Sequence, residues 1–457
     1  MSFIADKQTL EDLNLLGKYK PYSIYSLFNK VATTGGERKL EAMFQHPLTD
    51  AEAINQRSKL FQYFQHKALN FPFTREEIGI VEDFLGAGGG NILTAGVGAM
   101  RKKLMSTLVR DEAYGILQTG VQTVIHVLNN LIDLLGKLEE RESPELREFG
   151  RPYQEEVNLL KKILGDRRLS GLRQEKGVSQ LSLLKVARYD HLFRQVLAEE
   201  METIMEQIYR LDVCIAVSNV ARTKGFGYAQ ALPGENRILR ATALSHPGLE
   251  KAVANPISLH QDSNMLFLTG ANMAGKSTFM KSFGIAVYMA HMGFPVAASE
   301  MVFSIRDGIY SSINVPDNLA LGLSHFYAEV LRVKKVAEEV AGGKNLVVIF
   351  DELFKGTNVK DAYDATLAVT ESFSKYRNCF FIISTHIIEV GETLRERCDN
   401  LQFAYLPTVM EGNVPRYTYK MERGITTDRH GMMIIENENI LTILATEEGL
   451  KLKLHSN

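Results

Sequence analysis

The chain has 457 residues, of which 45% are hydrophobic and 23% are charged, and its formal net charge is −2. This is the composition of an ordinary globular protein, and the length is sufficient for two or three domains. The near-neutral charge gives no evidence for nucleic acid as a partner, although a local basic stripe could be hidden in it. No apolar run reaches about 18 residues, which excludes a membrane-spanning helix.

Cysteine usage and the first residues indicate the compartment. Cys214, Cys379 and Cys398 are widely spaced and form neither a metal-ligand pattern nor a disulfide framework. Residues 1–6 lack the basic and apolar regions of a signal peptide. We therefore expect a protein of the reducing cytoplasm that does not interact with membranes.

Residues 1–235 are expected to be mostly helical. Apolar residues recur at helical spacing, most clearly over residues 121–135. The predicted helices are Leu10–Lys18, Leu48–Gln65, Asp111–Arg141, Pro152–Leu164 and Leu181–Thr223. The last of these is longer than a typical globular helix, which suggests a long lever-like helix.

The pattern changes near Gly234. Three short apolar runs, Met265–Leu268, Leu346–Phe350 and Cys379–Ser384, alternate with helical segments, and each leads into a polar loop. Such alternation predicts an α/β domain with an at least partly parallel sheet. Ligands of these sheets bind beyond the carboxyl ends of the strands, where all three loops would lie. We predict an all-α domain over residues 1–235 and an α/β domain over residues 236–457.

The loop after the first apolar run fits the phosphate-binding pattern G-x-x-x-x-G-K-[ST]. Its residues are Gly270, Ala271, Asn272, Met273, Ala274, Gly275, Lys276, Ser277 and Thr278. The loop N–H groups and the start of a helix predicted over Phe279–Met292 would surround the phosphates. Lys276 can reach the β- and γ-phosphates, and the Ser277 hydroxyl can bind Mg²⁺. A glycine turn that merely caps a helix is the alternative.

The other two strands end in residues with catalytic chemistry. Asp351 is placed to hold Mg²⁺, and Glu352 is placed to polarise the attacking water. Alternatively, the two acids only cap the next element. His386 follows the third strand, and its position suggests a γ-phosphate sensor, although a single histidine there is more often a structural hydrogen-bonding group.

A fourth candidate lies between the glycine loop and the acidic pair, over Asp317–Glu329. By itself this segment indicates the start of a helix, with Ser324 as the N-cap. The functional interpretation is a helix N-terminus that is presented to a phosphate, as in ABC-type ATPases, where the phosphate belongs to the partner subunit. Both interpretations remain open.

These motifs resemble those of the MutS family of DNA mismatch-repair ATPases. Thr269–Thr278 is similar to the family's loop TGPNMGGKST, and its Asn-Met pair is more specific than the general pattern. The further matches are Gly293–Ala298, Asp351–Glu352 with Lys355–Thr357, Ser384–His386 and Gly424–Gly431 in the second half, and Ser26–Lys30, Thr33–Leu40, Pro47–Asp50, Arg57 and Leu211–Val213 in the first half. The resemblance implies a helical core and lever domain followed by an ABC-type P-loop ATPase domain.

The chain also departs from the family pattern. We expect the amino-terminal mismatch-recognition and connector domains to be absent, and the clamp between the levers to be reduced or absent. Ala252 stands where the family tends to place an aromatic residue that stacks on adenine. Leu323 replaces an arginine, and Arg429-His430 replaces a Ser-Tyr pair.

The resemblance implies an ATP- and Mg²⁺-dependent hydrolase that acts as a homodimer and handles DNA. In the composite pocket, one subunit would supply residues 270–278, Asp351, Glu352 and His386, and the other would supply Ser324. The basic clusters Arg101–Lys103, Lys161-Lys162 and Arg167-Arg168 could contact DNA phosphates or could be solvated helix faces. Repair or recombination is the expected process, and a repair partner protein is possible. Two alternatives stay open: an ATP-driven protein-interaction switch without DNA binding, and a degenerate scaffold with little hydrolysis.

Overall fold

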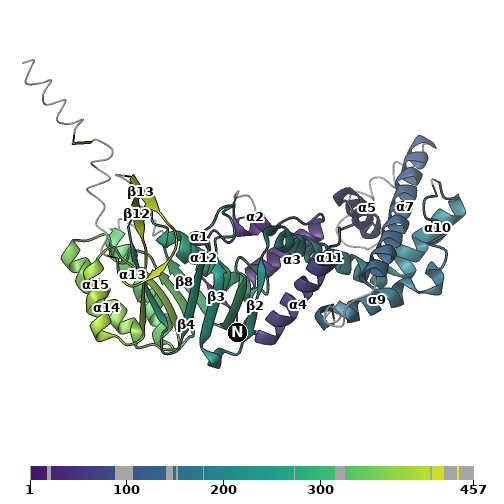
Figure 1. Cartoon of the computed structure of the whole chain (residues 1–457). Helices are drawn as coiled ribbons and strands as arrows, with labels where there is room; N and C mark the ends of the chain where they lie inside the picture. The colour runs from purple at the N-terminus through teal and green to yellow at the C-terminus, as the bar shows by residue number, and fades with distance from the viewer. Residues whose placement is uncertain are drawn as a thin grey trace, which may run out of the picture. The chain divides into compact units, whose positions relative to one another are not determined.

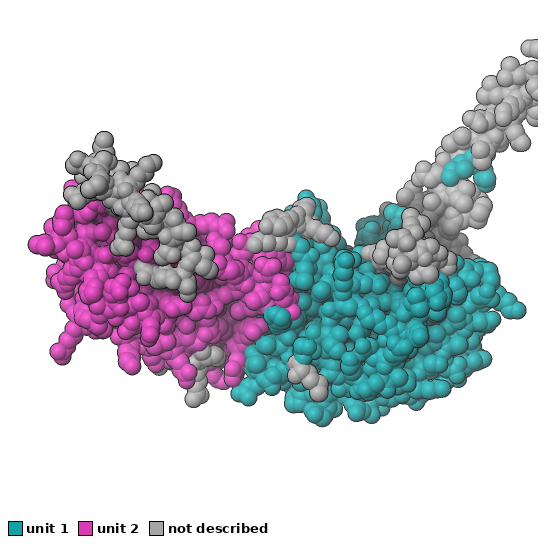
Figure 2. Space-filling view, turned by 180° about the vertical axis from the view of Figure 1, so that it is seen from behind, with its two compact units in different colours: residues 1–24, 46–55, 225–457 teal, residues 25–45, 56–224 magenta. Residues whose placement is uncertain are grey.

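The computed structural model describes residues 2–17, 22–87, 107–139, 148–150, 153–178, 180–271, 273–313, 325–411, 414–426 and 440–441. The chain divides into two compact units (Figure 2). Residues 1–24, 46–55 and 225–457 form one, which we call the sheet unit, and residues 25–45 and 56–224 form the other, which we call the helical unit. None of the described helices is long and apolar enough to cross a membrane.

The helical unit contains helices and no strand in its described part. Its elements are α2 (Ile24–Phe28), α3 (Thr34–Gln45), α4 (Ala51–Lys67), α5 (Arg75–Gly86), α7 (Thr107–Leu138), α9 (Gln154–Leu164), the 3₁₀ turn η2 (Arg167–Leu169), α10 (Leu183–His191), η3 (Leu192–Val196) and α11 (Ala198–Lys224) (Figure 1). The start of α2 and the first turn of α4 belong to the sheet unit. Three predicted helices, over 48–65, 111–141 and 152–164, correspond to α4, α7 and α9.

The predicted single helix over Leu181–Thr223 is wrong in its middle. A π-helical turn, η3, separates α10 from α11, and Leu197 then has φ −118° and ψ 28°. The buried residues Tyr189, Phe193, Leu197 and Met201 recur every four positions across this interruption.

A larger parallel sheet organises the sheet unit. Among the described residues its order is β1 (Ile4–Ala5), β8 (Gly308–Ser312), β9 (Leu346–Phe350), β10 (Phe380–Ser384), β5 (Met265–Gly270), β11 (Leu401–Leu406) and β14 (Glu422–Arg423). Every neighbouring pair is parallel except β11 and β14. All residues of β5, β9 and β10 are buried, as expected for strands covered on both faces.

Helices cover both faces of this sheet. On one face, α13 (His325–Ala341), α14 (Val359–Ser374) and α15 (Ile388–Arg397) supply Val336, Phe373 and Leu394 to the core built on alternate strand residues. On the other face lies α12 (Lys276–His291), which also contacts the smaller sheet (Figure 1). That sheet has the order β4 (Asn255–His260), β3 (Ile238–Leu244), β7 (Glu300–Ser304), β2 (Gly227–Leu232) and β6 (Pro295–Val296). The remaining elements are the turn η4 (Gly234–Asn236) and the hairpin β12 (Thr408–Glu411) and β13 (Val414–Tyr417).

The N-terminal segment is part of the sheet unit. β1 pairs with β8, and α1 (Lys7–Asp12) follows it, capped by the Asp6 side chain, which accepts a hydrogen bond from the Thr9 backbone N–H. The helix predicted over Leu10–Lys18 is therefore wrong, because Leu13 is the C-cap and Asn14 takes a left-handed φ of 47°. The Asp6 carboxylate also pairs with the buried Arg332 of α13, which attaches this segment to the core.

Candidate nucleotide site

Three loops meet at one edge of the larger sheet. β9, β10 and β5 are neighbours and parallel, so their carboxyl ends lie side by side. Residues 270–278 follow β5, Asp351 and Glu352 follow β9, and His386 follows β10. The structure thus brings together the residues that the sequence singled out in three separate segments.

The glycine loop has the backbone geometry that its composition permits. Gly270 and Gly275 have φ values of 141° and 104°, where side-chain-bearing residues are strained. α12 begins at Lys276, directly after the N-cap Gly275. Met273 also has a positive φ, 66°, and its side chain is 77% exposed. Asn272 lies outside the described residues.

Lys276 is buried beneath the loop. Its ammonium group donates to the backbone oxygens of Gly270, at 2.8 Å, and Ala271, at 3.1 Å. Burial lowers the pKa of Lys276, and the nearby carboxylates of Asp351 and Glu352 oppose that shift. The ammonium is therefore close to two acids and held inside the loop, where a phosphate oxygen could replace the carbonyl oxygens as acceptor.

Ser277 and Asp351 are placed to share a cation. The Ser277 hydroxyl donates to Asp351 Oδ2 at 2.5 Å, and the other carboxylate oxygen accepts from the Ser384 hydroxyl. Hydroxyl and carboxylate oxygens are ligands that Mg²⁺ prefers, usually with several waters retained. The donor set therefore fits Mg²⁺, although the described positions contain no group of three or more His, Cys, Asp or Glu residues that could by itself hold a metal ion.

Glu352 lies in a strained turn after β9. Its φ is 56°, and its backbone N–H donates to Ser384 O at 3.1 Å. The next two residues, Leu353 and Phe354, are buried in the core, which fixes the turn and directs Glu352 toward the loop edge. An aromatic contact between Phe326 and Phe354, with centroids 6.0 Å apart, adds to this anchor.

The Glu352 carboxylate has basic neighbours. Oε1 is 2.5 Å from His386 Nε2, and Oε2 is 3.7 Å from Lys355 Nζ. The hydrogen bond from His386 is the largest influence that lowers the pKa of Glu352, and burial acts against it. Glu352 is thus an ionised carboxylate near neutral pH, in contact with the residue predicted as a phosphate sensor.

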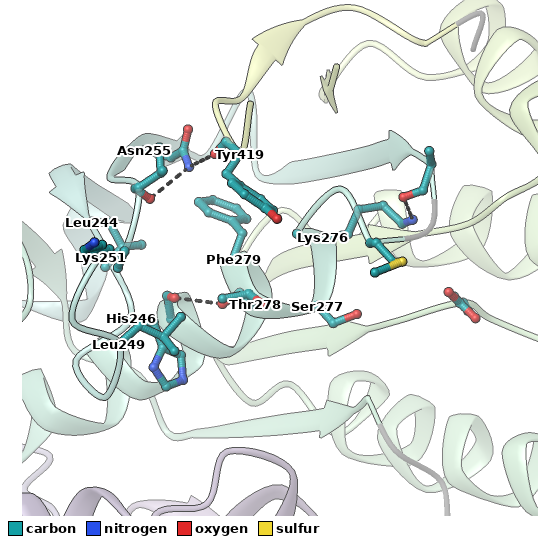
Figure 3. Close-up of a pocket in the computed structure, with 17 residues that line it drawn as sticks. Leu244, His246, Leu249, Lys251, Asn255, Lys276, Ser277, Thr278, Phe279 and Tyr419 are labelled. Atoms are coloured by element: carbon teal, nitrogen blue, oxygen red, sulfur yellow. Dashed lines mark hydrogen bonds between the residues drawn. The ribbon is translucent and has the colours of Figure 1, made fainter. Parts of the chain in front are cut away.

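A cavity of about 500 Å³ opens beside the loop. Lys276, Ser277 and Glu352 line one part of it, and its other walls come from the segment 244–255, α12 and Tyr419 (Figure 3). Ala252 lines the cavity at the position where the expected aromatic residue is missing. The sequence analysis did not identify Tyr419, because the residue is 143 positions beyond Lys276 and lies in no recognisable motif.

Several candidates cannot be placed. Ser324, Leu323, the cluster 101–103 and the pair Arg429-His430 lie outside the described residues. Two other basic clusters are visible on the helical unit, and each is partly neutralised. Lys161 pairs with Glu139, and Arg168 pairs with Asp166.

Comparisons with known proteins agree with these motifs. A family model described as MutS domain III matches residues 8–218, and one described as MutS domain V, the family's ATPase domain, matches residues 266–450. The DNA mismatch repair protein MutS of Petrotoga mobilis is 23% identical over an alignment that covers 94% of this chain and 62% of the relative. The protein of the same name from Fusobacterium nucleatum is 26% identical, with 85% of this chain and 52% of the relative covered.

The chain thus spans less than two thirds of the length of either relative. The matches nevertheless extend over both halves of the chain and agree with the motifs at the sheet edge. The chain is a MutS-like protein and belongs to the MutS family.

Proposed function

We propose that this chain is a Mg²⁺-dependent ATPase with an ABC-type P-loop domain over residues 236–457 and a helical core and lever domain over residues 1–235. One observation carries the proposal: Lys276, Ser277, Asp351, Glu352 and His386 converge at one sheet edge, next to a cavity of about 500 Å³. Each has the chemistry that phosphoryl transfer to water requires.

The roles follow from the contacts. Residues 270–278 and the N-terminus of α12 surround the phosphates, and Lys276 donates to them. Ser277 and Asp351 hold Mg²⁺, which would neutralise charge on the phosphate oxygens. Glu352 accepts a proton from the attacking water, and His386 keeps that carboxylate ionised. As a γ-phosphate sensor, His386 would exchange its contact with Glu352 for one with the phosphate.

We further propose a homodimer with a composite site, in which Ser324 of one subunit approaches the nucleotide of the other. This part is based on the sequence, since Ser324 precedes α13 directly. ATP would draw the two ATPase domains together, and hydrolysis would release them. The helices of the helical unit would convert that motion into movement at the ends that engage DNA.

The process that we propose is DNA repair or recombination, and both relatives are named DNA mismatch repair proteins. One observation favours the second candidate, an ATP-driven protein switch. The acids that pair with Lys161 and Arg168 reduce the positive charge available for DNA phosphates. Binding to duplex and junction DNA across a salt series separates the two, because a phosphate-dependent complex weakens steeply with salt.

The ATPase proposal is tested with two variants. Lys276→Ala should abolish ATP binding, and Glu352→Gln should bind ATP but turn over slowly, by a factor on the order of 10² or more. Lys334→Ala is the matched control, because Lys334 is exposed on α13 and pairs with the equally exposed Glu338. Turnover that survives in Lys276→Ala would refute the site.

The composite site requires a separate measurement. The ATPase rate per subunit should rise with protein concentration as dimers form, and Ser324→Ala should lower the rate without loss of ATP binding. A concentration-independent rate from a protein that sediments as a monomer with ATP would refute the dimeric site and leave the P-loop assignment intact.

A further inference from the structure

A single buried hydroxyl group links the two acids of the site. Ser384 is the last residue of β10 and is completely buried. Its hydroxyl donates to Asp351 Oδ1, and the same oxygen accepts from the Glu352 backbone N–H at 3.2 Å. Because an N–H can only donate, the serine oxygen must accept from Glu352, and its one proton is directed to the carboxylate of Asp351.

The main chain of Asp351 is held independently of its side chain. β9 pairs with β8 on one side and with β10 on the other, and the Asp351 backbone N–H donates to Ser312 O at 2.9 Å. These contacts fix the backbone, but they leave the carboxyl group able to rotate about its own side-chain bonds. The orientation of the carboxylate is therefore decided by the groups that its two oxygens contact.

The two carboxylate oxygens are held by hydroxyl groups from different elements. Asp351 Oδ1 accepts from Ser384 at the end of β10, and Oδ2 accepts from Ser277 in the first turn of α12. Ser277 lines the cavity beside the phosphate loop, whereas Ser384 is buried within the sheet. The contact with Ser384 therefore occupies the oxygen on the protein side and leaves Oδ2 at the loop, where it shares a place with the other proposed Mg²⁺ ligand.

The contact of Ser384 with Glu352 is of a different kind, because it is duplicated. The Glu352 N–H also donates to the backbone oxygen of Ser384, at 3.1 Å, and the buried residues Leu353 and Phe354 anchor the turn that follows. Removal of the hydroxyl would leave these contacts in place. Its loss would thus affect the orientation of Asp351 much more than the position of Glu352, so the two effects can be separated by experiment.

We infer that Ser384 is a positioning residue for the metal ligand: its hydroxyl holds Asp351 Oδ1 and so directs Oδ2 toward Ser277 and the phosphate loop, where Mg²⁺ would bind. This inference rests on the proposed ATPase function and adds a role that the glycine loop and the acidic pair do not supply. Groups that hydrogen-bond to a metal ligand orient it, and their loss costs about 10- to 100-fold in metal affinity. Ser384 therefore acts through Asp351 on the affinity for Mg²⁺ and not on the nucleotide itself.

The metal dependence of nucleotide binding tests this inference. Calorimetry measures the affinity of the full chain for a nonhydrolysable ATP analogue over a series of Mg²⁺ concentrations, and also in EDTA. Ser384→Ala should raise the Mg²⁺ concentration that gives half of the full increase in affinity by about 10- to 100-fold, while the affinity in EDTA stays unchanged. The rate of ATP turnover should recover as more Mg²⁺ is added, because excess metal compensates for a weaker site. A merely structural defect would not respond to the metal in this way.

Two results would overturn the inference: an unchanged Mg²⁺ requirement in Ser384→Ala, or an affinity that falls equally with Mg²⁺ and in EDTA. Ser374→Ala is the matched control, because it removes another buried hydroxyl of the sheet unit, one that donates to Glu371 O, and it should leave the Mg²⁺ requirement unchanged. Asp351→Ala reports on the site itself. A normal Mg²⁺ requirement in that variant would refute the proposed metal site, and with it the proposed function, rather than the role of Ser384.

Three further variants separate the role of the hydroxyl from a folding defect. Ser384→Thr keeps the hydroxyl and should keep the Mg²⁺ requirement of the unmodified protein. Ser384→Cys is similar in size, but its thiol is a weak donor, so its Mg²⁺ requirement should shift in the same direction as that of Ser384→Ala. Adding Ser384→Ala to Asp351→Ala should cause no further shift, since no carboxylate remains to be oriented, and effects that multiply would overturn the inference. If Ser384→Ala does not fold, a Ser384→Cys protein with an unaltered Mg²⁺ requirement overturns it.

Discussion

His291 provides a quantitative test of how the sheet unit is held together. α12 starts at Lys276 in the phosphate loop and ends at His291, which is completely buried. The ring contacts Leu48 O through Nδ1 at 2.9 Å, and the Arg306 backbone N–H donates to Nε2 at 3.3 Å. A carbonyl can only accept and an N–H can only donate, so the ring is neutral with its proton on Nδ1.

The magnitude follows from the pKa. Burial lowers the pKa of His291 from 6.5 to about 4, and the contact with Leu48 opposes the shift. One pKa unit corresponds to about 1.4 kcal/mol, so the shift is equivalent to about 3 kcal/mol. Because the unfolded chain binds the proton first, this stability is fully present above pH 6.5 and is lost as the pH falls toward 4.

The perturbation is His291→Asn, whose amide can still donate to Leu48 O but does not titrate. In the unmodified protein, imidazole NMR signals followed from pH 7 to pH 4 should show that His291 remains neutral until about pH 4. Unfolding free energies of the sheet unit should show a penalty for His291→Asn at pH 7 that shrinks by about 3 kcal/mol at pH 4.

Two results would refute this reasoning. A His291 signal that titrates near 6.5 would mean that the ring is accessible to water. A penalty that stays constant with pH would mean that the neutral ring is not required for the contact with Leu48. Either result would remove the inference that the end of α12 is fixed to the segment that leads into α4.

Three more predictions concern other contacts. His386→Ala should raise the pKa of Glu352, since the hydrogen bond from His386 is the chief influence that lowers it. The acid limb of the profile of kcat against pH should therefore move to higher pH. An unmoved limb would mean that Glu352 is not the base. Gly308→Ala should displace β1, because the new Cβ would lie 2.4 Å from Ile4 O. We expect the free energy of unfolding to fall by about 1–3 kcal/mol and proteolysis of the N-terminal segment to become faster. Unchanged proteolysis would contradict this prediction. Asp212→Ala should destabilise the helical unit by about 2–4 kcal/mol in urea unfolding, because the carboxylate accepts hydrogen bonds from Ala32 N, Thr33 N and Thr33 Oγ1. A change below about 0.5 kcal/mol would show that these hydrogen bonds contribute little.

Local patterns were sufficient to predict several strands and helices of the sheet unit. The runs predicted over 265–268 and 346–350 and the helix predicted over 279–292 correspond to β5, β9 and α12. The interruption at η3 was not, because it depends on which residues of a continuous apolar pattern are buried together. The domain boundary near residue 235 and the roles of the site residues remain predictions that the experiments above address.

The sequence alone determined the chemistry: a glycine loop with Lys276 and Ser277, two acids after a buried strand, and a histidine after another. Only the tertiary structure decided which distant groups join them. It attached residues 1–24 and 46–55 to the sheet unit, and it placed Tyr419, whose backbone oxygen accepts a hydrogen bond from Asn255, against Gly275. The physical reason is that motif spacing reflects the local backbone path, whereas these contacts depend on how strands far apart in the chain pair and pack.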